Sequence, residues 1–198
     1  MTADPEDGRP PWLDAPDPGP YPFEASHDLR QGPALHPALR ALVPFVGVWR
    51  GRGGGEYPTI AGFEFAQEIR FSHDGRPFLH YQSRAWLVEP DGRPIRPAAR
   101  EAGWWRPVTG PDGTTTDELE VLLCSPTGLM QLHLGRIEGV RVELASDAVV
   151  RTATAKEVTA ERRLYGIVEG ALLYAQDMAA VGRPLTSHLA ARLIRVAG

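Results

Sequence analysis

The sequence contains no asparagine and only one cysteine, Cys124, among its 198 residues. Without asparagine it has no N-glycosylation site, and a single cysteine excludes an intrachain disulfide. Lysine is nearly absent too: Lys156 is the only one, and apart from histidine all other basic side chains are arginines. Any role that requires a lysine ammonium therefore falls on Lys156. A lone thiol suits a reducing compartment, and we expect a cytoplasmic protein.

Long apolar runs and a basic excess are also missing. No stretch approaches the roughly 18 apolar residues that span a bilayer, and the acidic N-terminus lacks the apolar core of a secretory signal. We therefore expect no membrane association. Lysine and arginine number 21 against 25 aspartates and glutamates, a net charge of −4 that argues against nucleic-acid binding. A hydrophobic content of 42% is typical of a folded domain.

Proline is concentrated at the start of the chain, where the first 44 residues hold ten of the 19 prolines. Carboxylates greatly outnumber arginines over the first thirty residues. Because proline fixes φ and like charges repel, residues 1–33 are predicted to form a disordered, proline-rich acidic arm, and residues 34–198 the folded domain. Trp12, Tyr21 and Phe23 are candidate anchors for the arm, and a solvated tail is the simpler alternative.

Alternation of apolar and polar residues predicts β-strands over most of the domain. The clearest example is Gly62–Phe71, in which every second residue is aliphatic or aromatic except Gln67, the one polar residue on the apolar phase. Similar segments are expected at 45–53, 77–88, 101–107, 117–125, 128–135, 139–146, 158–168, 171–180 and 186–196.

Turn sequences such as His73–Gly75 and Pro90–Gly92 separate many of these segments. Ten short strands without helical crossovers predict an all-β fold, a ten-stranded antiparallel β-barrel whose closure removes exposed sheet edges. Barrels of this size enclose a cavity, so a ligand is expected. One short N-terminal helix of one or two turns is expected from Pro37, ended by Pro44.

Several common motifs are excluded. Gly51–Glu56 is glycine-rich but lacks the Gly-Lys-Ser/Thr of a phosphate loop. The six histidines show no zinc-ligand spacing, and no Gly-x-Ser-x-Gly motif occurs. Cys124 follows an apolar run and is interpreted as a small buried hydrophobic residue. Trp104 and Trp105 are neighbours on one predicted strand, so their rings are expected on opposite faces.

The segment Gly47–Ile60 carries a more specific signal. It contains a Gly-x-Trp-x-Gly-x-Gly pattern, formed by Gly47, Trp49, Gly51 and Gly53, that runs into Tyr-Pro-Thr-Ile. In this segment the chain resembles the nitrobindin family of haem-binding β-barrels. Three further segments resemble that family in the same order: Gly75–Leu79, Thr154–Thr159 and Val181–Leu189.

The resemblance covers about residues 35–196 and implies a lipocalin- or fatty-acid-binding-like barrel that holds one ferric haem b per subunit. It also implies that His188 is the axial ligand of the haem iron, a usual role for a neutral imidazole. Thr59 and Lys156 lie in matched segments and are candidates to bind the haem propionates, since a hydroxyl and an ammonium both donate hydrogen bonds. The simpler alternatives are an ordinary turn hydroxyl and a solvated charge. Arg192 is expected on the same strand face as His188, where it would either lie near the haem or disturb the pocket.

The activity that the resemblance implies is isomerisation of peroxynitrite to nitrate, with nitric oxide binding at the same iron position. The chemistry then belongs to the iron, and no separate catalytic residue is expected. The same resemblance suggests a homodimer. The alternative is a non-catalytic β-barrel that carries a fatty acid or another apolar ligand. The sequence feature that separates the two is His188, which a lipid carrier does not need.

Overall fold

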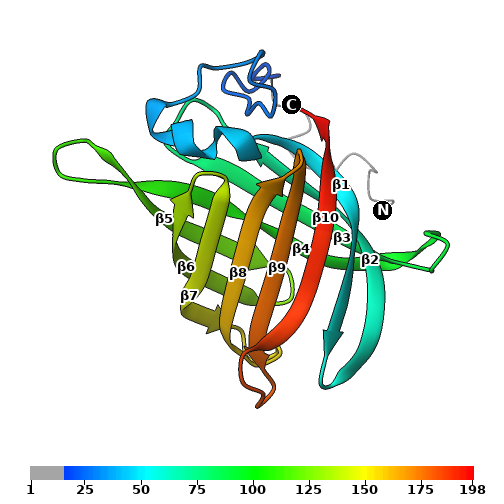
Figure 1. Cartoon of the computed structure of the whole chain (residues 1–198). Coiled ribbons are helices and arrows are strands. Elements are labelled where there is room, and N and C mark those ends of the chain that lie inside the picture. The colour runs from blue at the N-terminus through cyan, green and yellow to red at the C-terminus, as the bar shows by residue number, and fades with distance from the viewer. Residues whose placement is uncertain (1–15) are drawn as a thin grey trace, which may run out of the picture.

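The computed structural model describes residues 16–198, which form one short helix followed by ten antiparallel strands (Figure 1). The strands close into a barrel in which each pairs with its neighbours in sequence and β1 pairs with β10. The predicted ten-stranded barrel is confirmed. The elements are η3 (Pro37–Phe45), β1 (Gly47–Tyr57), β2 (Ile60–Ser72), β3 (Leu79–Val88), β4 (Pro94–Thr109), β5 (Thr115–Ser125), β6 (Leu129–Glu138), β7 (Arg141–Arg151), β8 (Val158–Val168), β9 (Ala171–Ala180) and β10 (Thr186–Ala197).

The predicted arm falls only partly within this range. Residues 1–15, which include Trp12, lie outside the described residues, and the extent of an arm over 1–33 stays a prediction. Within the described part, Ser26 forms an antiparallel bridge with His73 at the end of β2. Tyr21 and Phe23 are exposed and pack against each other, with ring centroids 6.0 Å apart.

The helix η3 is a 3₁₀ helix that covers the upper end of the barrel in Figure 1. Pro37 occupies its first turn as expected, but the helix continues through Pro44 to Phe45, so the predicted end at Pro44 is wrong. The φ angle that proline imposes is also that of a helix. Near a helix end, the missing N–H of proline removes few backbone hydrogen bonds. Leu39, Leu42 and Phe45 are fully buried against the barrel. Over residues 16–198 no helix is long and apolar enough to cross a membrane.

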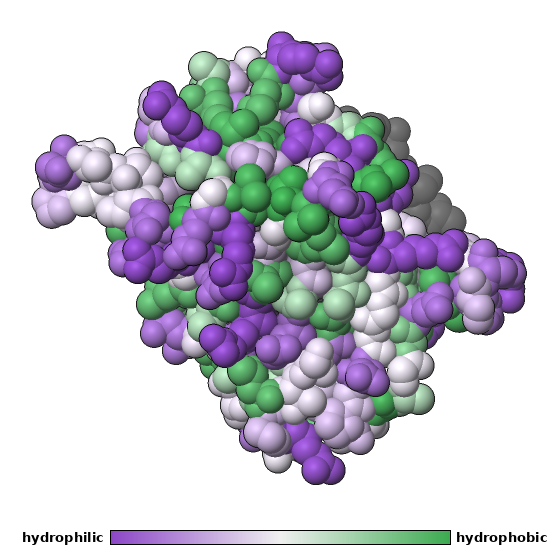
Figure 2. All heavy atoms as spheres, in the orientation of Figure 1, coloured by the Kyte–Doolittle hydropathy of each residue, from purple (hydrophilic) through white to green (hydrophobic). Residues whose placement is uncertain are grey.

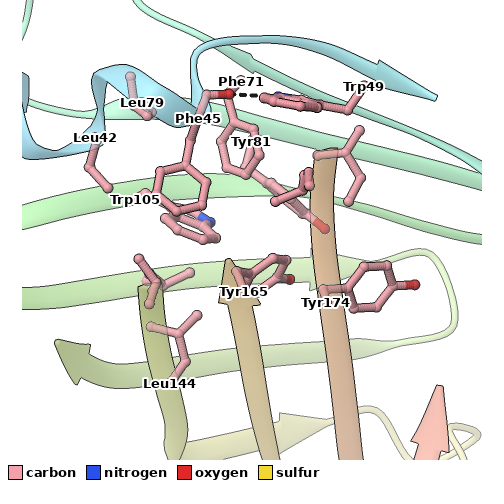
Figure 3. Packing of buried hydrophobic residues seen from close by; sticks show 14 of the residues in the cluster. Leu42, Phe45, Trp49, Phe71, Leu79, Tyr81, Trp105, Leu144, Tyr165 and Tyr174 are labelled. Carbon is pink, nitrogen blue, oxygen red and sulfur yellow. Dashed lines mark hydrogen bonds between the residues drawn. The ribbon is translucent and has the colours of Figure 1, made fainter. Parts of the chain in front are cut away.

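The upper half of the interior is packed with aromatic and aliphatic side chains (Figure 3). Trp105 lies among the rings of Phe45, Phe71, Tyr81 and Tyr165, with centroid distances between 5.0 and 6.1 Å. The predicted barrel cavity is therefore absent from this half of the described domain, because large rings fill it.

Alternation along β4 and β5 decides which residues face solvent. Trp105 is fully buried and Trp104 is 44% exposed, so their predicted placement on opposite faces is confirmed. Cys124 is exposed, and its interpretation as a buried residue is wrong. Leu123 takes the inward position, and an apolar run does not reveal which of its members point outward. The Cys124 thiol donates to the carbonyl oxygen of Ala102, 3.4 Å away.

The two halves of β4 are paired differently. From Ala102 to Trp105 the strand pairs with both β3 and β5, and from there to Thr109 it pairs with β5, whereas over residues 94–100 it pairs within the described chain with β3 alone. Residues 94–100 are exposed on both faces. The β3–β4 hairpin projects from the barrel (Figure 1), and Figure 2 shows hydrophilic residues at its tip. The barrel wall is thus incomplete beside the first half of β4.

Candidate functional site

The inner face of β1 carries a row of glycines. Trp49 is fully buried at the upper end of this face, and Gly51, Gly53 and Gly55 follow at alternate positions. Gly47 begins the strand with φ +141°, a conformation that side chains other than glycine's rarely adopt. Gly51, Gly53 and Gly55 therefore leave the interior beside β1 free of its own side chains, whereas Gly47 is required by its backbone conformation.

Side chains from the neighbouring strands occupy that space. A Cβ added to Gly55 would lie 2.5 Å from Cζ of Phe63 and 2.6 Å from Cδ2 of Leu189, which are closer than real Cβ atoms approach. A Cβ on Gly53 would likewise meet the ring of Phe65 at 2.6 Å. The glycines thus allow an apolar wall to close in around the lower end of the barrel.

His188 lies against this wall. Its Nδ1 is 3.0 Å from the carbonyl oxygen of Glu56. Because a carbonyl oxygen only accepts hydrogen bonds, Nδ1 carries the proton and Nε2 keeps a free lone pair. The rings of Tyr57 and Phe63 pack edge-on against the imidazole, with centroid distances of 5.5 and 6.4 Å. The imidazole is therefore held in one orientation with one nitrogen available as a ligand.

A β-bulge directs His188 inward. The register between β10 and β9 shifts between Ser187 and Leu189, so that His188 is the extra residue. His188 and Leu189 consequently line the same interior cavity, although strict alternation would place one of them outside.

The same bulge places Arg192 on the outer face. Its guanidinium is 3.7 Å from the carboxylate of Glu169, while Ala191 and Leu193 take the buried inward positions. The expectation that Arg192 shares a face with His188 and lies near the haem is wrong, because the extra residue reverses the phase of the strand between the two positions.

The β1–β2 turn and the β7–β8 loop lie at the same end of the barrel as the start of β10, the strand that carries His188 (Figure 1). Thr59 is in the β1–β2 turn, two residues after Tyr57, and Lys156 is in the β7–β8 loop, two residues before Val158. Tyr57 and Val158 pack in one apolar cluster, which brings the two loops together. Both candidate side chains are exposed, and among residues 16–198 neither forms a hydrogen bond or an ion pair.

A cavity of about 220 Å³ occupies the lower half of the interior, and His188 lies on its wall. We call it the polar chamber, because hydrophilic side chains from β2, β3, β4, β5, β6, β8 and β9 line it. Its polar residues besides His188 are Gln67, Ser83, Glu101, Ser125, Thr127, Gln131, Glu161, Arg163 and Gln176.

Arg163 is the centre of a buried charge network in this chamber. Its side chain is 2% exposed and contacts the carboxylates of Glu101 at 2.5 Å and Glu161 at 2.8 Å. Nε2 of His133 lies 3.1 Å from Glu161, whose other oxygen accepts from the Gln176 amide. Burial opposes ionisation of Glu161, but Arg163 and the hydrogen bond from His133 outweigh it and keep the pKa of Glu161 below its usual range.

Sequence reasoning missed this network. In β8 the inward positions hold Glu161 and Arg163, while the outward Leu164 is apolar, the reverse of the usual pattern. One signal was present: Gln67, the polar residue on the apolar phase of β2, is buried and donates to the Ser83 hydroxyl at 2.7 Å.

The donor set fits an iron porphyrin. His188 supplies an imidazole whose Nε2 is left free by the bond at Nδ1, Tyr57 and Phe63 supply flat aromatic surface beside it, and Gly55 makes room for that surface. A metal ion bound directly by the protein would need a cluster of three or more histidine, cysteine, aspartate or glutamate side chains. Residues 16–198 contain no such cluster. One protein ligand combined with an apolar wall favours a metal carried by a macrocycle.

Comparison with known proteins gives matches over most of the chain. The family described as THAP4-like, heme-binding beta-barrel domain matches residues 38–195. Two proteins named peroxynitrite isomerase, from Salinispora arenicola and Salinispora tropica, are each 67% identical over 190 residues, which is 96% of this chain and 96% of theirs. The crystal structure of Rv2717c from M. tuberculosis superposes with a TM-score of 0.69 at 40% identity, and the match covers 81% of this chain and 98% of that one.

Proposed function

We propose, from the premise that this chain belongs to the family of THAP4-like, heme-binding β-barrel domains, that it is a haem-dependent peroxynitrite isomerase. The resemblance to nitrobindins carried by Gly47–Ile60 agrees with that membership. The observation that carries the proposal is the orientation of His188: Nδ1 donates to the Glu56 carbonyl, and Nε2 is left to bind iron.

His188 is the axial ligand in this proposal. The β-bulge turns its imidazole inward, and the rings of Tyr57 and Phe63 fix the plane of the imidazole. Thr59 and Lys156 bind the propionates from the two loops beside the barrel end. Their solvent exposure supports this role, because a propionate edge is charged and stays in contact with water.

The bound group is ferric haem b, one per subunit, and when bound it supplies the iron centre at which the isomerisation takes place. Peroxynitrite and nitrate contain the same atoms and carry the same charge, so the reaction needs no reductant and no net proton. The residues of the chain therefore have to hold the cofactor, limit the access of water and admit a small anion. Nitric oxide, another small ligand, binds at the same iron position.

Two further properties belong to the same proposal. We place the protein in the cytoplasm, which agrees with its single exposed thiol. We also propose a homodimer, supported by Trp104 and Leu122, which pair across β4 and β5 and expose large apolar side chains on the outer face.

The alternative, a carrier of a fatty acid or another apolar ligand, is less well supported. The cavity that such a ligand would fill is lined by Arg163, Glu101 and Glu161 together with buried amides. Arg163 is already paired with two carboxylates, and a ligand carboxylate would have to displace them.

Titration of the apoprotein with ferric haem tests the proposal. We expect a saturable one-to-one Soret shift for the wild type and none beyond free haem for His188→Ala. Arg192→Ala is the matched control, because Arg192 lies on the same strand but faces outward. Added imidazole should restore the shift in His188→Ala by replacing the lost ligand. An unchanged spectrum for His188→Ala contradicts the assignment.

The activity is tested on the haem-loaded protein by rapid mixing with peroxynitrite. We expect an accelerated decay of peroxynitrite with nitrate as the product, and no acceleration with His188→Ala. Decay at the uncatalysed rate by wild-type protein with a full haem complement contradicts the proposed activity.

A further inference from the structure

A groove on the outside of the barrel concentrates positive charge. It has a volume of about 760 Å³ and crosses the outer face of β2, β3 and β4 as far as the end of β5. We call it the arginine groove, because Arg70, Arg84 and Arg100 line it. Cys124 lies at its β5 edge.

The register of the strands places these charges side by side. Arg50, Glu68, Arg84 and Arg100 are successive cross-strand neighbours on β1, β2, β3 and β4. Glu68 is held by Arg50 at 2.6 Å and by Arg84 at 2.8 Å, so its negative charge is already balanced. Among residues 16–198, Arg70 and Arg100 form no ion pair. The chain as a whole has a net charge of −4, so this local excess of positive charge is opposite in sign to the net charge of the protein.

The groove shares part of its wall with the polar chamber inside the barrel. Ser83, Glu101 and Ser125 line the arginine groove on the outside and also line the polar chamber on the inside. Glu101 and Ser125 lie at the edge of the incomplete wall, since the pairing of β4 with β5 begins only at Ala102, and Ser83 pairs with Glu101 from β3. The side chain of Glu101 is 20% exposed and bonds to Arg163 within the chamber. The groove and the polar chamber, whose wall includes His188, therefore lie on the two sides of the same three side chains.

We infer that the arginine groove collects small inorganic anions and that they enter the polar chamber beside Glu101, where β4 is not paired with β5. The inference rests on the proposed function, because the anions it would serve are the substrate peroxynitrite and the product nitrate. A charged cleft raises the local concentration of ions of opposite sign and accelerates their association, and salt screens the effect. Glu68 and Glu101 do not cancel it, because the groove is lined by three arginines against these two carboxylates.

The first test needs no haem. Cys124 is exposed at the edge of the groove and is the only cysteine, so its reaction rate reports the local potential. We expect Arg70→Gln combined with Arg100→Gln to slow the reaction of Cys124 with the anionic reagent dithiobis(nitrobenzoate) by about three- to tenfold at low salt. The reaction with neutral dithiodipyridine should not change. The matched control is Arg40→Gln combined with Arg162→Gln, two exposed arginines outside the groove, and it should leave both rates unchanged.

The second test uses the haem-loaded protein and asks whether anions reach the iron by way of the groove. In the groove variant, the association rate of azide, an anion, should fall by about three- to tenfold at low salt, and that of neutral nitric oxide should not. Attachment of a bulky maleimide to Cys124 should slow both ligands by obstruction, whereas Cys124→Ser treated in the same way should be unaffected.

The outcomes separate the two proposals. An unchanged azide rate in the groove variant overturns the access route, even if the thiol assay shows a positive groove. An unchanged rate with the anionic thiol reagent overturns anion collection itself. Failure of the wild type to take up haem contradicts the proposed function instead, and the thiol assay still reports on the groove in that case.

Discussion

The upper and lower halves of the barrel interior are built by the same strands and differ in chemistry. The upper half is a cluster of rings around Trp105, closed by Phe45 from η3. The lower half holds the polar chamber and the network around Arg163. The change takes place within single strands, because β8 contributes Tyr165 to the upper cluster and Arg163, two residues earlier, to the lower network. A barrel can therefore divide structural and ligand-binding roles along its axis without changing its topology.

The difference predicts two kinds of sensitivity to mutation. Apolar packing stabilises the upper half through buried area and close contact, which depend little on pH. The charges of the lower half stabilise the fold only while each keeps its partner, and this makes them sensitive to protonation.

Removal of the central ring should have the largest effect on stability. Trp105→Ala leaves a cavity among Phe71, Tyr81 and Tyr165, and we expect a loss of about 3–5 kcal/mol in the free energy of unfolding. Denaturant unfolding checks this, with Trp104→Ala as the exposed control, expected to lose about 1 kcal/mol or less. The folded fraction of Trp105→Ala should still bind haem. Equal losses for the two tryptophans contradict the packed upper half.

Loss of the buried Arg163 cation should destabilise the fold nearly as much as loss of the Trp105 ring, and the size of this effect should depend on pH. Arg163→Met leaves Glu101 and Glu161 without their cation, and we expect a loss of about 3 kcal/mol near neutral pH. In the wild type the pKa of Glu161 lies below its usual range, so its contribution is present above the ordinary glutamate pKa and is lost as the pH falls through the folded value.

In Arg163→Met the contribution of Glu161 to stability should depend on pH in the opposite direction. Without Arg163, burial raises the pKa of Glu161, and protonation of the carboxyl relieves an uncompensated charge. The gap in unfolding free energy between Arg163→Met and the wild type should therefore narrow as the pH falls from about 7 to about 5. A gap that stays constant over this range indicates that the network contributes through packing alone.

A smaller pH effect is expected from His73 at the end of β2. Burial lowers its pKa, partly opposed by Asp74, and neither ring nitrogen has a hydrogen-bond partner among residues 16–198. The unfolded chain thus binds a proton more readily, so wild-type stability should decline as the pH falls below the ordinary histidine pKa. His73→Leu should lessen that decline in melting temperature. An identical pH slope in the two proteins contradicts this role.

The weakest effects are expected at the exposed rim. Thr59→Val and Lys156→Met should each weaken haem binding several-fold, in line with about 1 kcal/mol for a solvent-exposed hydrogen bond. Neither should change the free energy of unfolding, because both side chains are exposed. Thr114→Val, in the β4–β5 hairpin, is the control in the same haem titration. Unaltered affinity in both rim variants removes Thr59 and Lys156 from the proposed site.

Much of the fold can be predicted from the sequence, because period-two alternation is a local property. It located all ten strands, and the order of the turns led to the closed barrel. The bulge at His188 could not be predicted, since an extra residue in one strand depends on its partners, and the phase error placed Arg192 on the wrong face. The inward charges Glu161 and Arg163 were missed for a related reason: alternation gives the period of a strand but not which phase faces inward.

The incomplete pairing of β4 also bears on how the protein avoids self-association through its backbone. An unpaired stretch of strand is a template on which another chain can add a strand, and this is a common start of aggregation. Over residues 94–100, where β5 does not cover the strand, the sequence places Pro94 and Pro97, which have no N–H to donate, and the charged Arg96 and Arg100. The wall can therefore stay open at this point without offering a usable edge to a foreign strand.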